Sequence, residues 1–420
     1  MRISTHEFLL GSLNDMLAQQ QNVNQLNREI ATGETMLDAG SDPGGAAQVI
    51  GFANQIGALK YDAANGQAAT QNLQVGMSAL QQVSTLLLQL RQTATAAANG
   101  TATSSDRQAY VNNAKALQQQ LIQLANTQNA NGGYLFAGSR SNGPAFSVLP
   151  SGKVVFNGDN ATNQVQIAPS LNITSTVSGQ NIFMNVAAGA QGVTVSAAAG
   201  NAGTAYAVAQ GLINPPQVSA ASLAGTQYDV SFAAGSGSSL TYQVTSGHGA
   251  PGSAGYNATS GVVASGGYIP NSDLSFGGIQ VQVSGTPVAG DSFAVRPGAT
   301  TSLFQTVQDL AAALALPQDT GAEKAQAQQA LQNVIADING AQTGILSAQA
   351  TLGTSLSEIQ SVQNQTSTQS ANANTAIANL QSANLPQVLA AYSEGLTALQ
   401  AAQLSFAKLQ NLTLFQYIRP

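Results

Sequence analysis

The chain has 420 residues, of which only 7% are charged, and it contains no Cys and no Trp. The lack of Cys excludes disulfides and thiolate metal sites. The net charge of −6 argues against nucleic acid as the main partner, because phosphate contacts need clustered Lys and Arg. No apolar run is long enough to predict a membrane span, and the first residues lack the apolar core of a cleaved secretory signal. Low charge with abundant Ala, Gly, Ser and Thr is typical of bacterial surface and secreted proteins.

The first stretch of the chain is predicted to be one long helix. Apolar side chains recur at alternating steps of four and three residues, which indicates a seam of the coiled-coil type. Polar residues interrupt this seam at Gln20 and Asn27. The apolar members of the seam are Leu9, Leu13, Met16, Val23 and Ile30.

Glycine, aspartate and proline gather directly after this helix. Glycine supplies unusual backbone angles, Asp42 can cap a helix, and Pro43 suits the first turn of the helix that follows. Gly40, Asp42, Pro43 and Gly44 are therefore expected to form a joint between two helical domains. A second helix follows, with an apolar stripe from Leu73 to Leu90. A third helix, capped by Ser105 or Asp106, is expected to reach about residue 129.

The middle of the chain differs from both ends, because it is rich in glycine and poor in charge. Short alternating apolar runs, separated by Gly, Ser, Asn and Pro, predict antiparallel strands. Residues 187–205 are expected to form a long loop, because Ala and Gly dominate them. The predicted strands cover residues 165–167, 228–232, 240–244, 279–283 and 293–295.

Helical periodicity returns at about Ser302 and continues through a stripe from Leu331 to Ile359. A last helix is expected to open at Pro386, which is a favourable first helical residue. Its stripe consists of Leu389, Tyr392, Leu396, Leu399 and Phe406.

The expected fold class is α+β: an elongated multi-domain chain with paired N- and C-terminal long α-helices and a central antiparallel β insertion domain. Three domains are expected. The terminal coiled-coil helices, residues 1–40 plus 381–420, would form the first, residues 41–140 plus 298–380 a long-helix domain, and residues 141–297 a β-rich domain at the far end.

The two terminal stripes have few apolar positions for their length. Such a pair would be marginal alone, and low surface charge suits a surface that becomes buried. We therefore expect the stripes to pack between subunits, the alternative being an ordinary core within one chain. The stripes at 73–90 and 331–359 are expected to be core within one subunit.

Several segments resemble the flagellin superfamily, and within it the hook–filament junction proteins. They are the opening "MRIST", "IATGETMLDAGSDPGGAAQ" at 30–48, "NTQNANGGYLFAG" at 126–138, "GTPVAGDSFAVRPG" at 285–298 and the closing "LQAAQLSFAKLQNLTLFQYI" at 399–418. The sequence departs from the family pattern at Ala31 and at Asp42-Pro43-Gly44, where a Ser and a double Asp are usual.

The resemblance implies an exported structural protein of the bacterial flagellum. Its copies would self-associate in a ring between hook and filament, with another hook-associated junction protein and flagellin as neighbours. Terminal helices would pack between subunits as an inner layer after type III export, and the β-rich domain at 141–297 would be the outer domain. An export chaperone would cover the C-terminal helix beforehand. The location implied is extracellular.

No residue pattern indicates catalysis, a metal site or a cofactor. His6 and His248 lie far apart without acidic clusters, and Asp38 and Asp42 do not have calcium-loop spacing. No nucleophile motif is present, so we expect no enzyme activity. Two other functions stay open. One is flagellin itself, the filament subunit, and the other is an exported surface binding protein or adhesin whose β insertion recognises a ligand.

Overall fold

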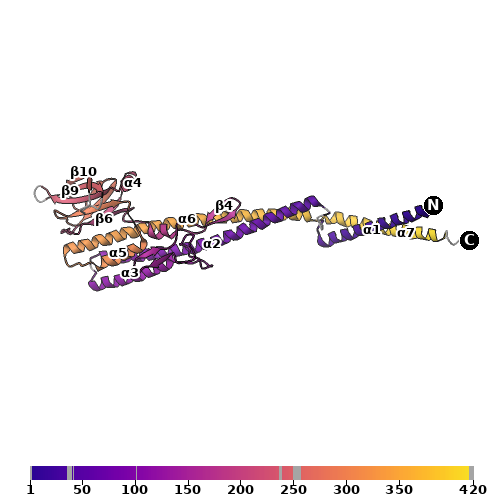
Figure 1. The fold of residues 1–420 in the computed structure, drawn as a ribbon, viewed down its shortest axis with the longest axis horizontal. Coiled ribbons are helices and arrows are strands. Elements are labelled where there is room, and N and C mark those ends of the chain that lie inside the picture. Colours follow the sequence, from indigo (N-terminus) through magenta and orange to yellow (C-terminus); the bar gives the residue numbers. More distant parts are fainter. Residues whose placement is uncertain are drawn as a thin grey trace. The chain divides into compact units, whose positions relative to one another are not determined.

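The computed structural model of the chain describes residues 2–35, 40, 42–100, 102–235, 239–248 and 257–415. Long helices occupy both ends of the sequence, and antiparallel strands occupy its middle (Figure 1). The predicted α+β class is confirmed. The chain divides into two compact units. Met1–Ala64 with Val362–Pro420 form one, called here the terminal unit, and Asn65–Ser361 form the other, the central unit. The predicted three-domain division stays a prediction.

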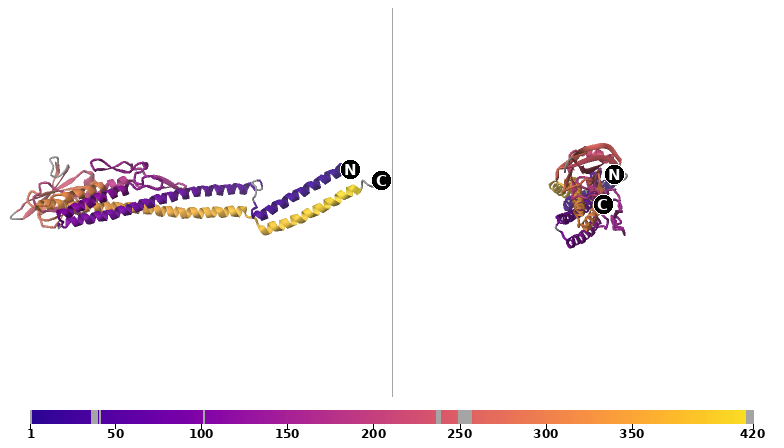
Figure 2. Two further views of the ribbon diagram at one scale, coloured as in Figure 1. Left: turned by 90° about the horizontal axis from the view of Figure 1, so that it is seen from below. Right: turned by 90° about the vertical axis from the view of Figure 1, so that its left-hand side faces the viewer.

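The terminal unit is built on α1 (Arg2–Thr32) and α7 (Leu385–Phe415). These two helices lie side by side and antiparallel, as Figures 1 and 2 both show. The first turns of α2 (Pro43–Ala98) and the last turns of α6 (Gly321–Gln381) complete the unit.

Asp42 caps the start of α2, and Pro43 is the first residue of that helix. The Asp42 Oδ1 accepts hydrogen bonds from the backbone N–H of Gly44 at 3.1 Å and of Gly45 at 3.0 Å. Gly40 lies in a turn with open space around it. These contacts agree with the cap and first-turn chemistry predicted for Asp42 and Pro43. That the segment is a joint between domains stays a prediction.

Four helices form the helical part of the central unit: α2, α6, α3 (Ser104–Ala125) and α5 (Leu303–Ala315). Thr103 caps α3, with Asp106 as its reciprocal partner, so the predicted caps Ser105 and Asp106 are wrong by two to three residues. The predicted inner stripes are confirmed as core within one chain. Their buried members include Leu73, Leu80, Leu87 and Leu90 on α2, and Leu331, Ile338, Ile345, Leu352 and Ile359 on α6.

An aromatic cluster joins these helices to the first part of the middle segment. Phe136, from the "YLFAG" motif, packs edge-on against Phe183 at 5.3 Å between ring centroids. Phe146 lies 5.4 Å from Phe183 and 5.1 Å from Phe304 of α5. Phe146 belongs to β1 (Phe146–Val148), and Phe183 to the π-helix η1 (Gln180–Met184). This part of the middle segment also contains β2 (Val154–Phe156), β3 (Gln164–Ala168) and β4 (Leu171–Thr174).

The rest of the middle segment is a sandwich of a five-stranded sheet, β10-β9-β8-β13-β6, and a three-stranded sheet, β11-β12-β7. Its core includes Val230, Val281, Phe293 and Val295, all fully buried. The short strands β5 and β14, which pair with each other, come just before β6 and just after β13 in the chain. The strands are β5 (Val186–Ala187), β6 (Val193–Ala197), β7 (Tyr206–Leu212), β8 (Gln227–Ala234), β9 (Leu240–His248), β10 (Asn257–Gly267), β11 (Asp273–Phe276), β12 (Ile279–Ser284), β13 (Ser292–Pro297) and β14 (Thr300–Thr301).

All five predicted strands are confirmed, whereas the long loop predicted at 187–205 is wrong. β6 lies inside that range and pairs with β13, and its Val193 and Val195 are buried in the sandwich. Alternation at Val193-Thr194-Val195 carried the strand signal, but the surrounding Ala and Gly obscured it. The short helix α4 (Pro215–Leu223) was also not predicted.

Gln329 of α6 fastens the sandwich to the helices of the central unit. Its Oε1 accepts the Ala207 N–H at 2.7 Å, and its Nε2 donates to the Ala207 carbonyl at 2.8 Å. The same Nε2 lies 3.2 Å from the Val195 carbonyl. The amide forms the hydrogen bonds that a neighbouring strand would form at the edge of β7, and it also bonds to β6. One buried side chain therefore connects α6 to both sheets.

We expect Gln329→Ala to lower the free energy of unfolding by about 2–4 kcal/mol. The change leaves the Ala207 N–H and carbonyl buried without partners, and each such group costs about 1–3 kcal/mol. Urea unfolding monitored by circular dichroism measures the loss. Gln328→Ala, at the preceding position of α6, is the matched control and should cost less than about 1 kcal/mol. Equal losses in both variants would contradict the role of the amide.

Asp337 of α6 predicts a pH dependence of stability. The pKa of Asp337 is raised to about 6, mainly because the carboxyl group is buried. The hydrogen bond from the Gly189 N–H lowers this pKa, and the nearby Asp309 charge raises it further. The folded chain therefore holds this proton at a pH where the unfolded chain has lost it. Stability should fall as pH rises from about 4 to about 6, by at most about 3 kcal/mol.

Urea unfolding at pH 5 and pH 7.5 checks this expectation. Asp337→Asn keeps an acceptor for the Gly189 N–H but has no charge, so the variant should lose this part of the dependence. Asp319→Asn, at an exposed position, is the control. If the Asp337 variant kept the full pH dependence of the parent, another group would be responsible.

Candidate assembly interface

α1 and α7 approach each other closely at Gly395. The Gly395 carbonyl accepts a hydrogen bond from the Gln19 Nε2 at 3.3 Å. A Cβ atom at Gly395 would lie 3.1 Å from Val23 Cγ2 and 4.0 Å from Leu26 Cδ1. Both Val23 and Gly395 are buried. Glycine therefore lets the two helices approach at this point, where a side chain would need space that Val23 occupies.

A strand-like bridge ties the end of α1 to the segment before α7. Glu34 pairs with Ser382 in an isolated antiparallel bridge. The Thr35 N–H donates to the Gln381 carbonyl, and the Ala383 N–H to the Gly33 carbonyl, each at 2.8 Å. Gly33 has φ +74°, which lets the chain leave the helix at little cost. This bridge holds the two helix ends in register, and no sequence pattern predicted it.

The structure brings the two predicted terminal stripes together within one chain. Leu389 is the exception, because it is exposed, and the side chain of Leu9 falls outside the described part of the chain. Packing of these residues between subunits therefore stays a proposal. Of the other predicted stripe residues, Val23 is buried, and Leu13, Met16, Ile30, Tyr392, Leu396, Leu399 and Phe406 are partly buried.

The seam on α1 differs by one residue from the prediction at two places. Gln19 and Leu26 face α7, whereas the predicted seam positions Gln20 and Asn27 are exposed. From Val23 the seam continues by a step of three residues to Leu26, whereas the predicted rhythm placed a step of four there. Both steps keep residues on one helical face, so periodicity alone does not separate them.

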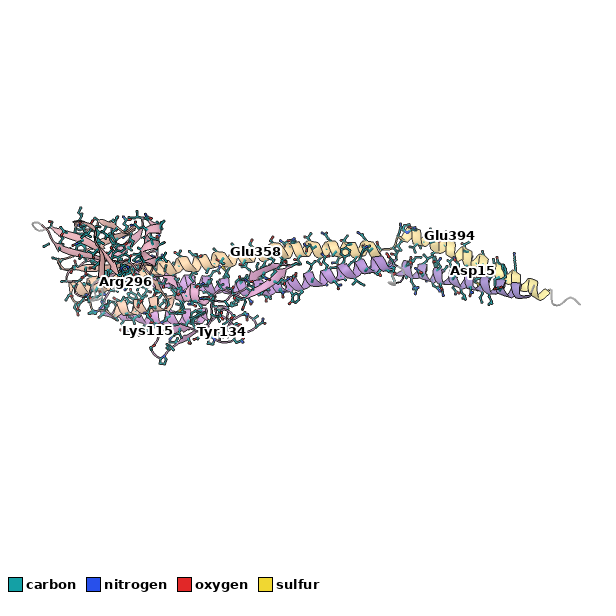
Figure 3. The ribbon with its side chains drawn as sticks, turned by 45° about the horizontal axis from the view of Figure 1, so that its top comes forward. Asp15, Lys115, Tyr134, Arg296, Glu358 and Glu394 are labelled. Atoms are coloured by element: carbon teal, nitrogen blue, oxygen red, sulfur yellow. The ribbon has the colours of Figure 1, made fainter. Side chains whose placement is uncertain are left out.

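Large apolar side chains remain exposed on the outer sides of the pair. Phe8 is 59% exposed, Leu17 46% and Leu404 67%. Charges are sparse on both helices, and Figure 3 labels Asp15 on α1 and Glu394 on α7. Soluble monomers rarely leave wide apolar surfaces uncovered, so this face is a candidate for association. The other exposed apolar residues of this unit are Leu10, Ile50, Tyr61, Leu385 and Leu389.

The described residues contain neither a cluster of metal ligands nor a membrane-spanning helix. No group of three or more His, Asp or Glu side chains in these ranges is arranged to hold a metal ion. His248 is exposed, and its Nε2 lies 3.0 Å from the Ala224 carbonyl oxygen. His6 and Asp38 fall outside the side chains that the structure describes. None of the helices, as far as they are described, is both long and apolar enough to cross a bilayer.

The chain is similar to known flagellar proteins. The model of the bacterial flagellin N-terminal helical region matches residues 3–141. Flagellar hook-associated protein 3 of Escherichia coli (strain K12) is 29% identical over 191 residues, which cover 45% of this chain and 59% of that protein. A flagellin of Clostridium tyrobutyricum is 24% identical over 236 residues, 55% of each chain.

The solved structures support the same relationship. The crystal structure of flagellar hook associated protein-3 from Legionella pneumophila aligns with a TM-score of 0.71 and 28% identity, over 78% of this chain and 98% of that one. The chain spans only 59% of the length of the curated Escherichia coli relative. The relatives are structural proteins of the flagellum and not enzymes.

Proposed function

Because this chain resembles flagellar hook-associated protein 3 in sequence and in fold, we propose that it is a structural subunit of the bacterial flagellum at the junction between hook and filament. Copies would self-associate in a ring there, next to another hook-associated junction protein and flagellin. The protein would act outside the cell, after type III export, with a chaperone on α7 before export.

The exposed apolar surface of the terminal unit is the observation that carries this proposal. α1 and α7 bury one stripe against each other and leave Phe8, Leu17 and Leu404 uncovered. Covering a Leu side chain contributes roughly 1.5–3 kcal/mol, and an array of copies would cover several per subunit. Sparse charge on both helices means that few ions would have to be desolvated in that array.

Localisation on assembled flagella tests the proposal. The full chain, carrying an epitope inserted between Gly235 and Ser239, would be expressed in a strain that lacks its own copy. Gold-labelled antibody would then be viewed by electron microscopy. A label confined to the boundary between hook and filament is expected. Absence of any label on flagella that form normally would overturn the proposal.

Flagellin itself is the second candidate, favoured by the match to the Clostridium tyrobutyricum protein. The two functions differ in self-assembly. We expect the purified full chain to stay mostly monomeric in sedimentation velocity experiments, also after addition of ammonium sulfate at a concentration that polymerises a reference flagellin. Long filaments formed from this chain alone, or a label along the whole filament, would favour flagellin.

A further inference from the structure

A cavity of about 660 Å³ lies in the central unit, between α6, the edge of β7 and the segment that runs from η1 through β5. Val208 and Gln210 of β7 form one wall, and Gln332, Ile335 and Asn339 of α6 form the facing wall. The volume lies within the range of about 300–1,000 Å³ that small-molecule sites usually have. No step of the proposed assembly uses this cavity.

Contacts with α6 hold the third wall of the cavity in place. The Asp337 Oδ1 accepts the Gly189 N–H, and both groups are buried. One turn further along α6, a Cβ at Gly340 would meet the Ala187 carbonyl oxygen at 2.4 Å, so only glycine allows this approach. Gln191 has φ +54°, which is rare for a residue other than glycine. The wall is therefore fixed before any ligand arrives, and strain of this kind is common at binding sites.

The lining has a narrow chemistry. Among the described residues around the cavity none is charged and none is aromatic. Aliphatic surface comes from Ile182, Val186, Val208 and Ile335. Carboxamides supply most of the hydrogen-bonding side chains, together with the hydroxyls of Thr343 and Ser347. Gln210 bonds to Gln282, and Asn339 to Arg91. The other carboxamides, Asn181, Asn185, Gln191 and Gln332, all within the described ranges, form no side-chain hydrogen bond within the chain.

We propose that this cavity binds a neutral oligosaccharide of two or three sugar units. A carboxamide offers two donors and an acceptor oxygen, which matches neighbouring sugar hydroxyls that both donate and accept. The aliphatic side chains cover the C–H faces of the sugar rings. Nucleotides and acidic sugars fit poorly because no Lys or Arg lines the cavity, and flat bases would find no aromatic ring to stack on.

The inference does not depend on the proposed junction role, since the cavity lies wholly within the central unit. Variants at the lining should change sugar binding and leave incorporation into flagella unchanged. Failure of sugar binding would therefore leave the junction proposal standing, and the reverse also holds.

Saturation-transfer NMR with the full chain provides the test. The probes are maltotriose, cellotriose and N,N′,N″-triacetylchitotriose at millimolar concentration, with 3′-sialyllactose as the acidic comparison. We expect transfer to at least one neutral trisaccharide, at least about tenfold weaker transfer to 3′-sialyllactose, and a dissociation constant that titration calorimetry can measure.

Two variants locate the binding. Gln332→Leu removes a carboxamide from α6, and Asn185→Ala removes an exposed one from the third wall. Each variant should bind the trisaccharide at least about tenfold more weakly, because it loses one or two hydrogen bonds to the sugar. Gln328→Leu, one turn earlier on α6 and outside the lining, is the matched control. Circular dichroism verifies that each variant is folded.

Three results would overturn the inference. They are no transfer to any neutral trisaccharide, unchanged affinity in the Asn185 variant, and binding of an uncharged extended peptide such as acetyl-Thr-Val-Thr-Val-amide in place of the sugars. The last result would identify the cavity as a site for strand addition at β7.

Discussion

Aspartate at both Leu17 and Leu404 is expected to abolish incorporation into flagella while the monomer stays folded. Both side chains are largely exposed in the single chain, so replacing them removes few contacts within it. In an assembled array the same positions would be covered. Each buried Leu contributes roughly 1.5–3 kcal/mol, and a buried carboxylate without a partner costs several kcal/mol more. Association should weaken at least about 100-fold, since each 1.4 kcal/mol is a factor of ten.

Motility in soft agar and immunogold labelling measure the loss in cells, and the melting temperature of the purified chain measures the fold. The matched control is Asn14→Asp with Ser405→Asp, which adds the same charges at exposed polar positions of the same two helices. Normal motility in the Leu17 and Leu404 double variant would remove the exposed apolar surface as the basis of assembly. A large drop in the monomer's melting temperature would mean that these residues stabilise the single chain.

Local pattern was sufficient to predict the parts of the fold that depend on neighbours in sequence. Alternation of Tyr228, Val230 and Phe232 indicated β8, and the stripe from Leu331 to Ile359 indicated the buried face of α6. Asp42 followed by Pro43 indicated the start of α2. In each case the side-chain chemistry that fixes the backbone lies within a few residues of it.

The features that sequence reasoning missed depend on contacts between distant residues. In the sequence Gln329 is one of many glutamines on a polar helix. Its partner, Ala207 at the edge of β7, lies more than a hundred residues away, so no local pattern indicates the hydrogen bond. The bridge between Glu34 and Ser382 joins the two ends of the chain. A glycine such as Gly395 lowers the expected stability of a helix interior, and its reason lies on α1. No periodicity reports such contacts.

Gly395→Leu should separate α1 from α7 in the single chain. The first added atom would already lie 3.1 Å from Val23 Cγ2 and 3.4 Å from Gln19 Nε2, so a leucine must push these side chains aside. Overpacking of this kind costs about 1–3 kcal/mol, partly offset by the better helix propensity of leucine. Gly395→Ala adds only the Cβ atom and gains about 1 kcal/mol of propensity, so its net effect should be close to zero.

Hydrogen exchange read by peptide locates the effect. In the Gly395→Leu variant, amides of Arg2–Thr32 and Leu385–Phe415 should exchange about 5- to 50-fold faster, as a loss of about 1–2.5 kcal/mol implies. Amides of the central unit should exchange as in the parent. Val23→Ala in the same chain returns the space that leucine needs, so the double variant should exchange more slowly than the single Leu variant. If Gly395 and Val23 did not share a contact, the stability losses of the two single variants would add. The double variant would then exchange as fast as that sum predicts, which would contradict the contact.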